Sequence, residues 1–292
     1  MKLITYTPGG GIPGDRIGAL LDHERRIVDF AAAADHYGVG DVSVFNDMLA
    51  LIDGGEPALA AATDLIKNVL RDGLEVAVVD AAAVMLRAPL PVPRRLRDCL
   101  AFEKHFRQAR AQGLKLRAAS LADPEAAERM LKASGSFEIP KAWYEIPVYY
   151  KGNHFSVVGT ETEIRWPRYC ERLDYEHELA IVIGKKGVNI SRGEARSFIF
   201  GYTIFNDMSA RDTQYREMEP GTGPAKAKDF DTGNVMGPCI VTADEIGDPY
   251  DLEMISRING VERGRGNSGD MYHKFEDILV HASADERSTP EK

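Results

Sequence analysis

The stretch DYEHELAIVIGKKG, Asp174 to Gly187, decides how the larger part of this 292-residue chain is interpreted. Its centre, HELAIVIG, is a continuous apolar run that ends at glycine, which is typical of a strand buried on both faces. Glu176 and Glu178 stand at the start of this run, two residues apart. Because alternate side chains of a strand point to the same side, both carboxylates should lie on one face, beside a core.

A third acid, Asp207, follows the apolar run YTIF in GYTIFNDMSARDTQ. Carboxylates that converge beside a core cannot all stay ionised without partners, because burial costs each of them several kcal/mol and like charges raise one another's pKa. A hard divalent cation would balance them, and Mg²⁺ and Ca²⁺ prefer carboxylate oxygens. The spacing leaves a second interpretation open, in which the two glutamates lie on a solvated edge and pair with Lys185 and Lys186.

The composition argues against several classes of protein. A net charge of −9 makes nucleic acid an unexpected partner, because affinity for phosphates comes largely from basic groups. The most apolar window, LEVAVVDAAAVML, is short and contains Asp80, so no membrane span is predicted. Glycine and proline interrupt MKLITYTPGGGIPGDR before an export signal develops, and we expect a cytoplasmic protein. Neither a disulfide framework nor a zinc site is indicated by the widely spaced Cys99, Cys170 and Cys239.

A proline-rich segment divides the chain into two parts. Residues 1–87 predict a small mixed domain with short strands and one helix, EPALAAATDLIKNVL, that ends at Gly73. The linker is predicted at RAPLPVPRR, Arg87 to Arg95. Residues 88–292 begin with two helical segments, LRDCLAFEKHFRQARAQG, expected to end at Gly113, and DPEAAERMLKAS, and continue mainly as short strands. An α+β fold is therefore predicted.

Three stretches, LDYEHELAIVIGK, GYTIFNDMSARDTQ and KDFDTGNVMGPCIVTADEI, occur in an order and spacing that resembles the fumarylacetoacetate hydrolase family. The similarity covers roughly Arg87 to Asp277. It implies that residues 88–292 fold as a mixed β-roll, that the protein is a homodimer, and that it binds Mg²⁺, or else Ca²⁺ or Mn²⁺. The metal ligands that the resemblance implies are Asp98, Glu176, Glu178 and Asp207.

The resemblance also implies catalytic residues. The enzyme that gives the family its name has a catalytic histidine seven residues after an aspartate, and here His105 follows Asp98 by seven. If the segment were helical throughout, both side chains could share one face. His177 is instead expected to point away from the two glutamates on the strand. Further residues implied to bind substrate are Tyr150, Arg211, Gln214 and Lys228, of which the last three are also implied to be catalytic.

The reaction that suits this set of residues is hydrolysis of a carbon–carbon bond in a β-diketo acid, such as fumarylacetoacetate or an acylpyruvate. A metal that chelates the paired oxygens would stabilise the departing enolate, and a neutral histidine could take a proton from water. Two alternatives are left open. One is a hydratase, decarboxylase or isomerase of a 2-oxo acid on the same metal site, and the other is a metal-binding homologue with impaired catalysis.

Two features depart from the family's pattern. Leu100 stands where the name-giving enzyme has an aromatic residue. The segment KFEDILVHASADE is followed here by ERSTPEK, whereas family members continue with a loop that contacts substrate, further strands, and a glutamate that orients the histidine. We therefore expect the β-roll to be incomplete at its C-terminal end and the hydrolytic activity to be impaired.

Overall fold

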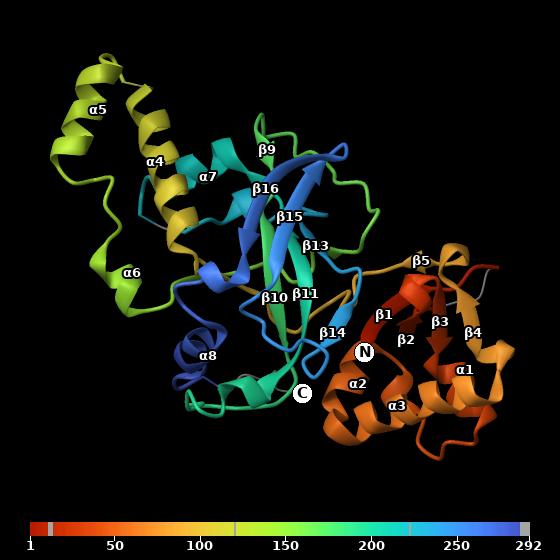
Figure 1. The fold of residues 1–292 in the computed structure, drawn as a ribbon. Coiled ribbons are helices and arrows are strands. Elements are labelled where there is room, and N and C mark those ends of the chain that lie inside the picture. The colour runs from red at the N-terminus through yellow and green to blue at the C-terminus, as the bar shows by residue number, and fades with distance from the viewer. Residues whose placement is uncertain (11–13, 120, 222, 287–292) are drawn as a thin grey trace.

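The structure is a computed structural model that describes residues 1–10, 14–119, 121–221 and 223–286 (Figure 1). It has the predicted α+β composition. The α-helices are α1 (Phe30–His36), α2 (Met48–Asp53), α3 (Gly55–Asp72), α4 (Glu103–Ala119), α5 (Pro124–Ala133), α6 (Lys141–Glu145), α7 (Arg211–Met218) and α8 (Phe275–Ser283). The strands before the acidic stretch are β1 (Lys2–Thr7), β2 (Arg16–Leu21), β3 (Arg26–Asp29), β4 (Val78–Asp80), β5 (Met85–Leu86), β6 (Arg97–Cys99), β7 (Tyr149–Lys151), β8 (Val157–Val158) and β9 (Leu173–Asp174). The later strands are β10 (His177–Ile183), β11 (Ile199–Asp207), β12 (Ser209–Ala210), β13 (Asn234–Met236), β14 (Ile240–Thr242), β15 (Glu253–Ile258) and β16 (Val261–Asn267).

One curled, mixed sheet of ten strands runs through the molecule. Its strands follow in the order β4-β3-β2-β1-β14-β11-β13-β8, while β5 pairs with β1 and β10 pairs with β11. All of these pairs are antiparallel except β13 with β8. Gly201 of β11 permits the approach of β14, because a Cβ there would lie 2.4 Å from the carbonyl oxygen of Val241. The N-terminal strands thus extend the sheet that carries the predicted site.

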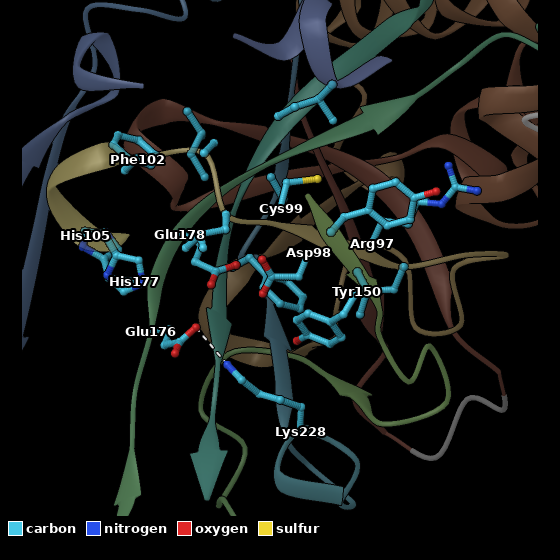
Figure 2. Close-up of a pocket in the computed structure, with 18 of the residues that line it drawn as sticks. Arg97, Asp98, Cys99, Phe102, His105, Tyr150, Glu176, His177, Glu178 and Lys228 are labelled. Atoms are coloured by element: carbon cyan, nitrogen blue, oxygen red, sulfur yellow. Dashed lines mark ion pairs between the residues drawn. The ribbon is translucent and has the colours of Figure 1, made fainter. Parts of the chain in front are cut away.

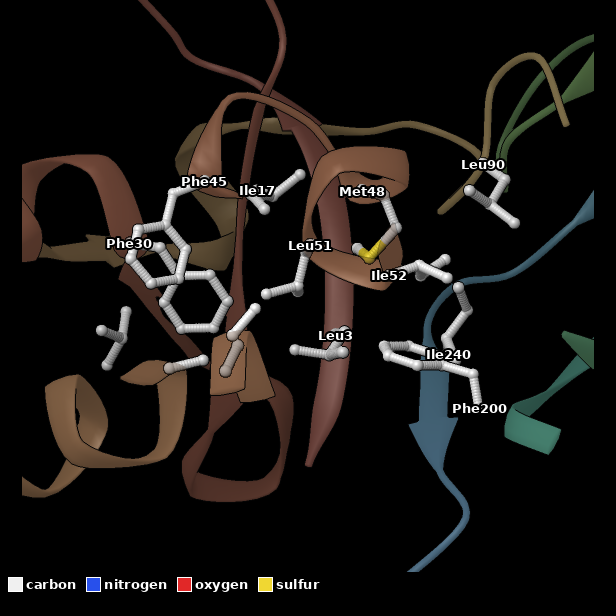
Figure 3. Packing of buried hydrophobic residues seen from close by; sticks show 14 of the residues in the cluster. Leu3, Ile17, Phe30, Phe45, Met48, Leu51, Ile52, Leu90, Phe200 and Ile240 are labelled. Atoms are coloured by element: carbon white, nitrogen blue, oxygen red, sulfur yellow. The ribbon is translucent and has the colours of Figure 1, made fainter. Parts of the chain in front are cut away.

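The main hydrophobic core joins the N-terminal helices to this sheet. It contains Leu3 of β1, Leu51 of α2, Phe200 of β11 and Ile240 of β14, all of them buried (Figure 3). The core is therefore continuous across residue 87, and the division into two domains at that residue stays a prediction. The predicted helix of the N-terminal part is confirmed as α3, which ends at Gly73 in the left-handed conformation.

The segment that carries the predicted base differs from the expectation. Asp98 lies on strand β6 and His105 on helix α4, so the chain between them is not helical throughout. The prediction that the helix ends at Gly113 is also wrong, because α4 continues through LKLRAA, whose residues favour helix. Gly113 instead allows α4 to approach α7 closely, since a Cβ there would lie 3.3 Å from Cε1 of Tyr215.

Strand β10 is a half-buried edge strand, and not the fully buried strand that its apolar run predicts. Among the described strands it pairs only with β11. Both faces are nevertheless apolar, because Ala180 and Val182 pack against the main core while Leu179 and Ile181 pack against a second core beside α8. Most of the C-terminal ERSTPEK lies outside the described residues, and the incomplete end of the roll stays a prediction. None of the described helices combines the length and apolar content that a membrane crossing requires.

Replacing Ile240 by alanine tests the continuous core. Ile240 is fully buried, and removing such a side chain typically costs about 2–5 kcal/mol of unfolding free energy. We expect one cooperative transition with its midpoint moved to lower urea, measured by circular dichroism. The control Val76→Ala, at a residue that is 71% exposed, should change stability by less than about 0.5 kcal/mol. Similar losses in both variants would contradict the assigned core.

Candidate metal centre

Two antiparallel strand pairs bring the four predicted metal ligands together. In the pair β10–β11, Glu178 lies on β10 and the backbone N–H of Asp207 donates to the carbonyl of Glu176 at 3.1 Å. In the pair β6–β7, Asp98 lies opposite Tyr150. One oxygen from each of the four carboxylates lies within 4.8 Å of the others. We call Asp98, Glu176, Glu178 and Asp207 the acidic cluster, and Figure 2 shows three of its members turned toward one space.

Two basic side chains neutralise part of the acidic cluster. Lys228 is 3% exposed, and its Nζ lies 2.5 Å from Oδ2 of Asp207 and 2.8 Å from Oε2 of Glu176. Arg211 forms ion pairs with Glu176 and, at 2.9 Å, with Asp174. Burial alone would raise the pKa of Glu176, but Lys228 and Arg211 outweigh it and hold that pKa at about 2.

The alternative interpretation of the two glutamates is wrong. Neither of the lysines that it invokes is the partner of Glu176, and Nζ of Lys185 instead lies 3.5 Å from Glu56. The acidic cluster is also not on a solvated edge, since Asp207 has no exposed surface and the side chain of Glu176 is only 14% exposed. The charges are therefore held inside the protein.

For the other two acids, Asp98 and Glu178, the charge of Lys228 does not outweigh burial and the neighbouring carboxylates. Burial, followed by the charge of Asp207, raises the pKa of Asp98 to about 8. Burial and the neighbouring carboxylates Asp98 and Asp207 raise the pKa of Glu178 well above its ordinary value. Neither Asp98 nor Glu178 forms an ion pair within the described residues. Oδ1 of Asp207 is buried without a hydrogen-bond partner among them. Fully ionised, the acidic cluster would carry two negative charges more than its two basic partners can balance.

A divalent cation fits this imbalance in both charge and chemistry. The acidic cluster offers only carboxylate oxygens, which are the ligands that Mg²⁺, Mn²⁺ and Ca²⁺ prefer. A bound cation would neutralise the excess charge and give the buried Oδ1 of Asp207 a partner. The residues that would hold the ion are thus the four predicted from the sequence.

The predicted base lies at the same cavity as the acidic cluster. This cavity has a volume of about 1840 Å³, and His105 lines it with an exposed side chain. Partial desolvation of the imidazole at the cavity lowers the pKa of His105, and the charge of Glu176 opposes that effect only in part. The imidazole is therefore neutral at pH 7. His177 lines this cavity as well, and the expectation that it points away from the two glutamates stays a prediction.

The remaining predicted residues also meet at this cavity. The hydroxyl of Tyr150 donates to Oδ2 of Asp207 at 2.5 Å, and Oε1 of Gln214 accepts from Arg211 at 3.0 Å. The Tyr150 contact holds the carboxylate of Asp207, and the Gln214 contact holds the guanidinium that pairs with Glu176. The predicted contacts of Tyr150 and Gln214 with substrate stay predictions. Sequence reasoning missed Asp174 as the second partner of Arg211. The alternation that places two glutamates on one face could have identified it, because Asp174 precedes the first of them by two residues.

A buried carboxylate cluster and an imidazole that line one cavity define a candidate metal centre. The family profile described as "Fumarylacetoacetate (FAA) hydrolase C-terminal" matches residues 115–290. The chain belongs to the fumarylacetoacetate hydrolase family, as the sequence motifs predict.

Relatives and solved structures agree with this assignment. The mitochondrial oxaloacetate tautomerase of Homo sapiens is 37% identical over 137 residues, which is 47% of this chain and 43% of that protein. The match thus spans less than half of the human protein. An oxaloacetate tautomerase of Bacillus subtilis is 29% identical over 265 residues, covering 90% of this chain and 78% of that protein. The structure of maleylpyruvate hydrolase from Sphingobium, in complex with manganese(II) and pyruvate, shares the fold with a TM-score of 0.64 and 22% identity, covering 97% and 83% of the two chains.

Replacing Asp98 by asparagine distinguishes the destabilising effect of its buried charge from the stabilising effect of a bound ion. Because the pKa of Asp98 is raised, the ion-free folded protein keeps a proton on Asp98 at pH values where the unfolded chain releases it. Asp98 therefore lowers the free energy of unfolding as pH rises from about 4 to about 8. At pH 8 in EDTA, Asp98→Asn should therefore raise Tm. Mn²⁺ should raise the Tm of the wild type, and by more at pH 8 than at pH 6. It should not raise the Tm of Asp98→Asn.

Differential scanning fluorimetry at both pH values measures these shifts. Asp64→Asn is the matched control, because Asp64 is 71% exposed on α3 and should leave the response to Mn²⁺ unchanged. An Asp98→Asn protein that is destabilised in EDTA at pH 8 and still responds fully to Mn²⁺ would contradict the assigned site.

Proposed function

We propose that the chain is a divalent-metal-dependent enzyme that interconverts the enol and keto forms of a 2-oxo dicarboxylic acid, with oxaloacetate as the first substrate to test. The observation that carries the proposal is a neutral imidazole, His105, at the cavity of a carboxylate centre with two uncompensated charges. The names of the human and Bacillus relatives support this chemistry. We propose Mn²⁺ or Mg²⁺ as the ion, and Mn²⁺ is the ion in the Sphingobium structure.

Tautomerisation of a 2-oxo acid moves one proton between carbon C3 and the oxygen on C2. A divalent ion at the acidic cluster supplies Lewis-acid polarisation of the 2-oxo group. His105 is the proposed proton carrier, because its neutral imidazole can accept the proton of C3 and return it to the oxygen. No water enters the bond changes, and one base suffices for both transfers.

We propose that Lys228 stabilises the enolate. Burial opposes its charged form, but Asp207 and Glu176 outweigh burial and raise the pKa of Lys228, so the ammonium stays protonated. Two of its three N–H donors are used by these carboxylates. The third is left for an oxygen of the substrate, and a fixed donor of this kind contributes on the order of 10²–10³ in rate.

Hydrolysis of a β-diketo acid, the reaction predicted from the sequence, is the second candidate. Its support is the exposed position of His105, from which the imidazole can reach a water molecule, and the shared fold of the maleylpyruvate hydrolase. Within the described residues, however, no hydrogen bond orients the imidazole of His105. In a serine protease, replacing the carboxylate that orients the histidine lowers kcat by about 10⁴. We therefore propose tautomerisation as the main activity and expect hydrolysis to be slow.

The test measures the conversion of enol oxaloacetate to the keto form through the decrease in enol absorbance. Wild-type protein with Mn²⁺ should accelerate the conversion, and EDTA should remove the effect. His105→Ala should lower the rate by about 10²–10⁴ and still bind Mn²⁺. The control is His36→Ala, which removes a histidine of α1 in the N-terminal part and should leave the rate unchanged.

A parallel assay of acylpyruvate and fumarylacetoacetate cleavage distinguishes the two candidates. Rapid cleavage, at about 1–10³ s⁻¹, without accelerated ketonisation would contradict the proposal and support the hydrolase. A His105→Ala protein as active as the wild type would remove His105 from the reaction.

A further inference from the structure

Trp143 on α6 lies between the two parts of the chain that carry Asp98 and His105. Its indole N–H donates to the carbonyl of Leu100 at 2.8 Å, and Leu100 follows Asp98 by two residues, directly after the end of β6. Its ring also packs against Phe106, with 5.6 Å between the ring centroids. Phe106 is the neighbour of His105 in the first turn of α4. One side chain therefore contacts both the segment that directly follows the strand of Asp98 and the helix that carries His105.

The environment of Trp143 is built to hold it in one position. The side chain is 2% exposed. The rings of Tyr144, Tyr272 and His273 surround it, with centroids 5.0–5.2 Å away. A ring nitrogen of His273 lies 2.5 Å from the carbonyl of Trp143. An indole fixed on several sides by aromatic contacts and hydrogen bonds acts as a rigid support.

The segment between β6 and α4, residues 100–102, is held in place by contacts with other parts of the chain. It has no regular structure of its own, and its backbone is held by a bond from Leu100 to the carbonyl of Val148 and by a bond from Tyr272 to the carbonyl of Ala101. The indole bond adds a side-chain attachment at the carbonyl of Leu100, which lies between these two backbone contacts. His105 itself has no hydrogen bond within the described residues, so its place over the cavity is set by the position of α4.

We propose that Trp143 is a positioning residue that sets the separation between the imidazole of His105 and the acidic cluster. The inference rests on the proposed function of His105 as the proton carrier. Trp143 does not line the cavity. It acts through the indole bond to Leu100 on one side and the ring contact with Phe106 on the other. A misplacement of a reacting group by about 1 Å costs on the order of 10²-fold in rate.

The test uses Trp143→Phe, which keeps an aromatic ring and removes the N–H donor. We expect kcat for ketonisation to fall by about 10- to 10²-fold, with KM changed less than about threefold. Phe106→Leu removes the other contact and should give a similar loss. Trp166→Phe is the matched control, because the indole of Trp166 also donates to a backbone carbonyl, that of Cys170 at 2.6 Å, away from this cavity.

A measurement without turnover tests the same point. In protein labelled with ¹³C-histidine and freed of metal, the His105 resonance should move in Trp143→Phe and in Phe106→Leu, and not in Trp166→Phe. Added Mn²⁺ should broaden the His105 resonance to a different extent in the two variants than in the wild type. Unchanged resonances in both variants would overturn the proposal, even if the wild type has no tautomerase activity.

Combining the variants shows whether Trp143 acts through His105. Starting from His105→Ala, Trp143→Phe should cause no further loss of rate. A loss as large as in the wild-type background would show that Trp143 acts elsewhere and would overturn the inference. A wild-type protein that does not accelerate ketonisation, but whose variants show the expected changes in the His105 resonance, would contradict the proposed function. It would not contradict the positioning role of Trp143.

Discussion

The excess negative charge of the acidic cluster is the constraint on which the other features of the site depend. Four carboxylates lie within 4.8 Å of one another, and Lys228 and Arg211 are the basic groups paired with them. In a buried setting such an excess is unfavourable until protons or a cation remove it. The excess arises because the curled sheet, which carries Glu178 and Asp207, and the separate strand pair β6–β7, which carries Asp98, bring acids that are distant in sequence to one point.

The same arrangement limits what chemistry the site can perform. Arg211 and Lys228 are paired with carboxylates, which leaves one N–H donor of Lys228 as the proposed contact to substrate. His105 remains the neutral base at the cavity, and nothing in the described chain hydrogen-bonds its imidazole. A reaction that needs one proton moved within the substrate suits this geometry better than one that needs an oriented attacking water.

Much of the site could be predicted from the sequence, for physical reasons that differ between residues. Glu176 and Glu178 follow from strand alternation, and Asp207 from its place at the end of an apolar run. Asp98 and His105 required the family resemblance, since one lies on a strand and the other on a helix and no single periodicity relates them. Spacing could identify neighbours along an element, but not partners between elements.

The errors have a common origin in tertiary contacts. A glycine normally suggests a helix end, but Gly113 lies inside α4 where the helix meets Tyr215. The apolar run of β10 suggests a central strand, but it faces two separate cores along one edge of the sheet. None of these contacts leaves a local signal in the sequence.

The most direct test of the central claim is an anomalous difference map from crystals soaked with Mn²⁺ and measured at the manganese absorption edge. The account predicts one strong peak per chain, between the carboxylates of Asp98, Glu176, Glu178 and Asp207. Crystals of Glu178→Gln, which keeps the shape and removes one charge, should show a weaker peak or none. The absence of a peak at the acidic cluster in the wild type, or an undiminished peak in Glu178→Gln, would contradict it.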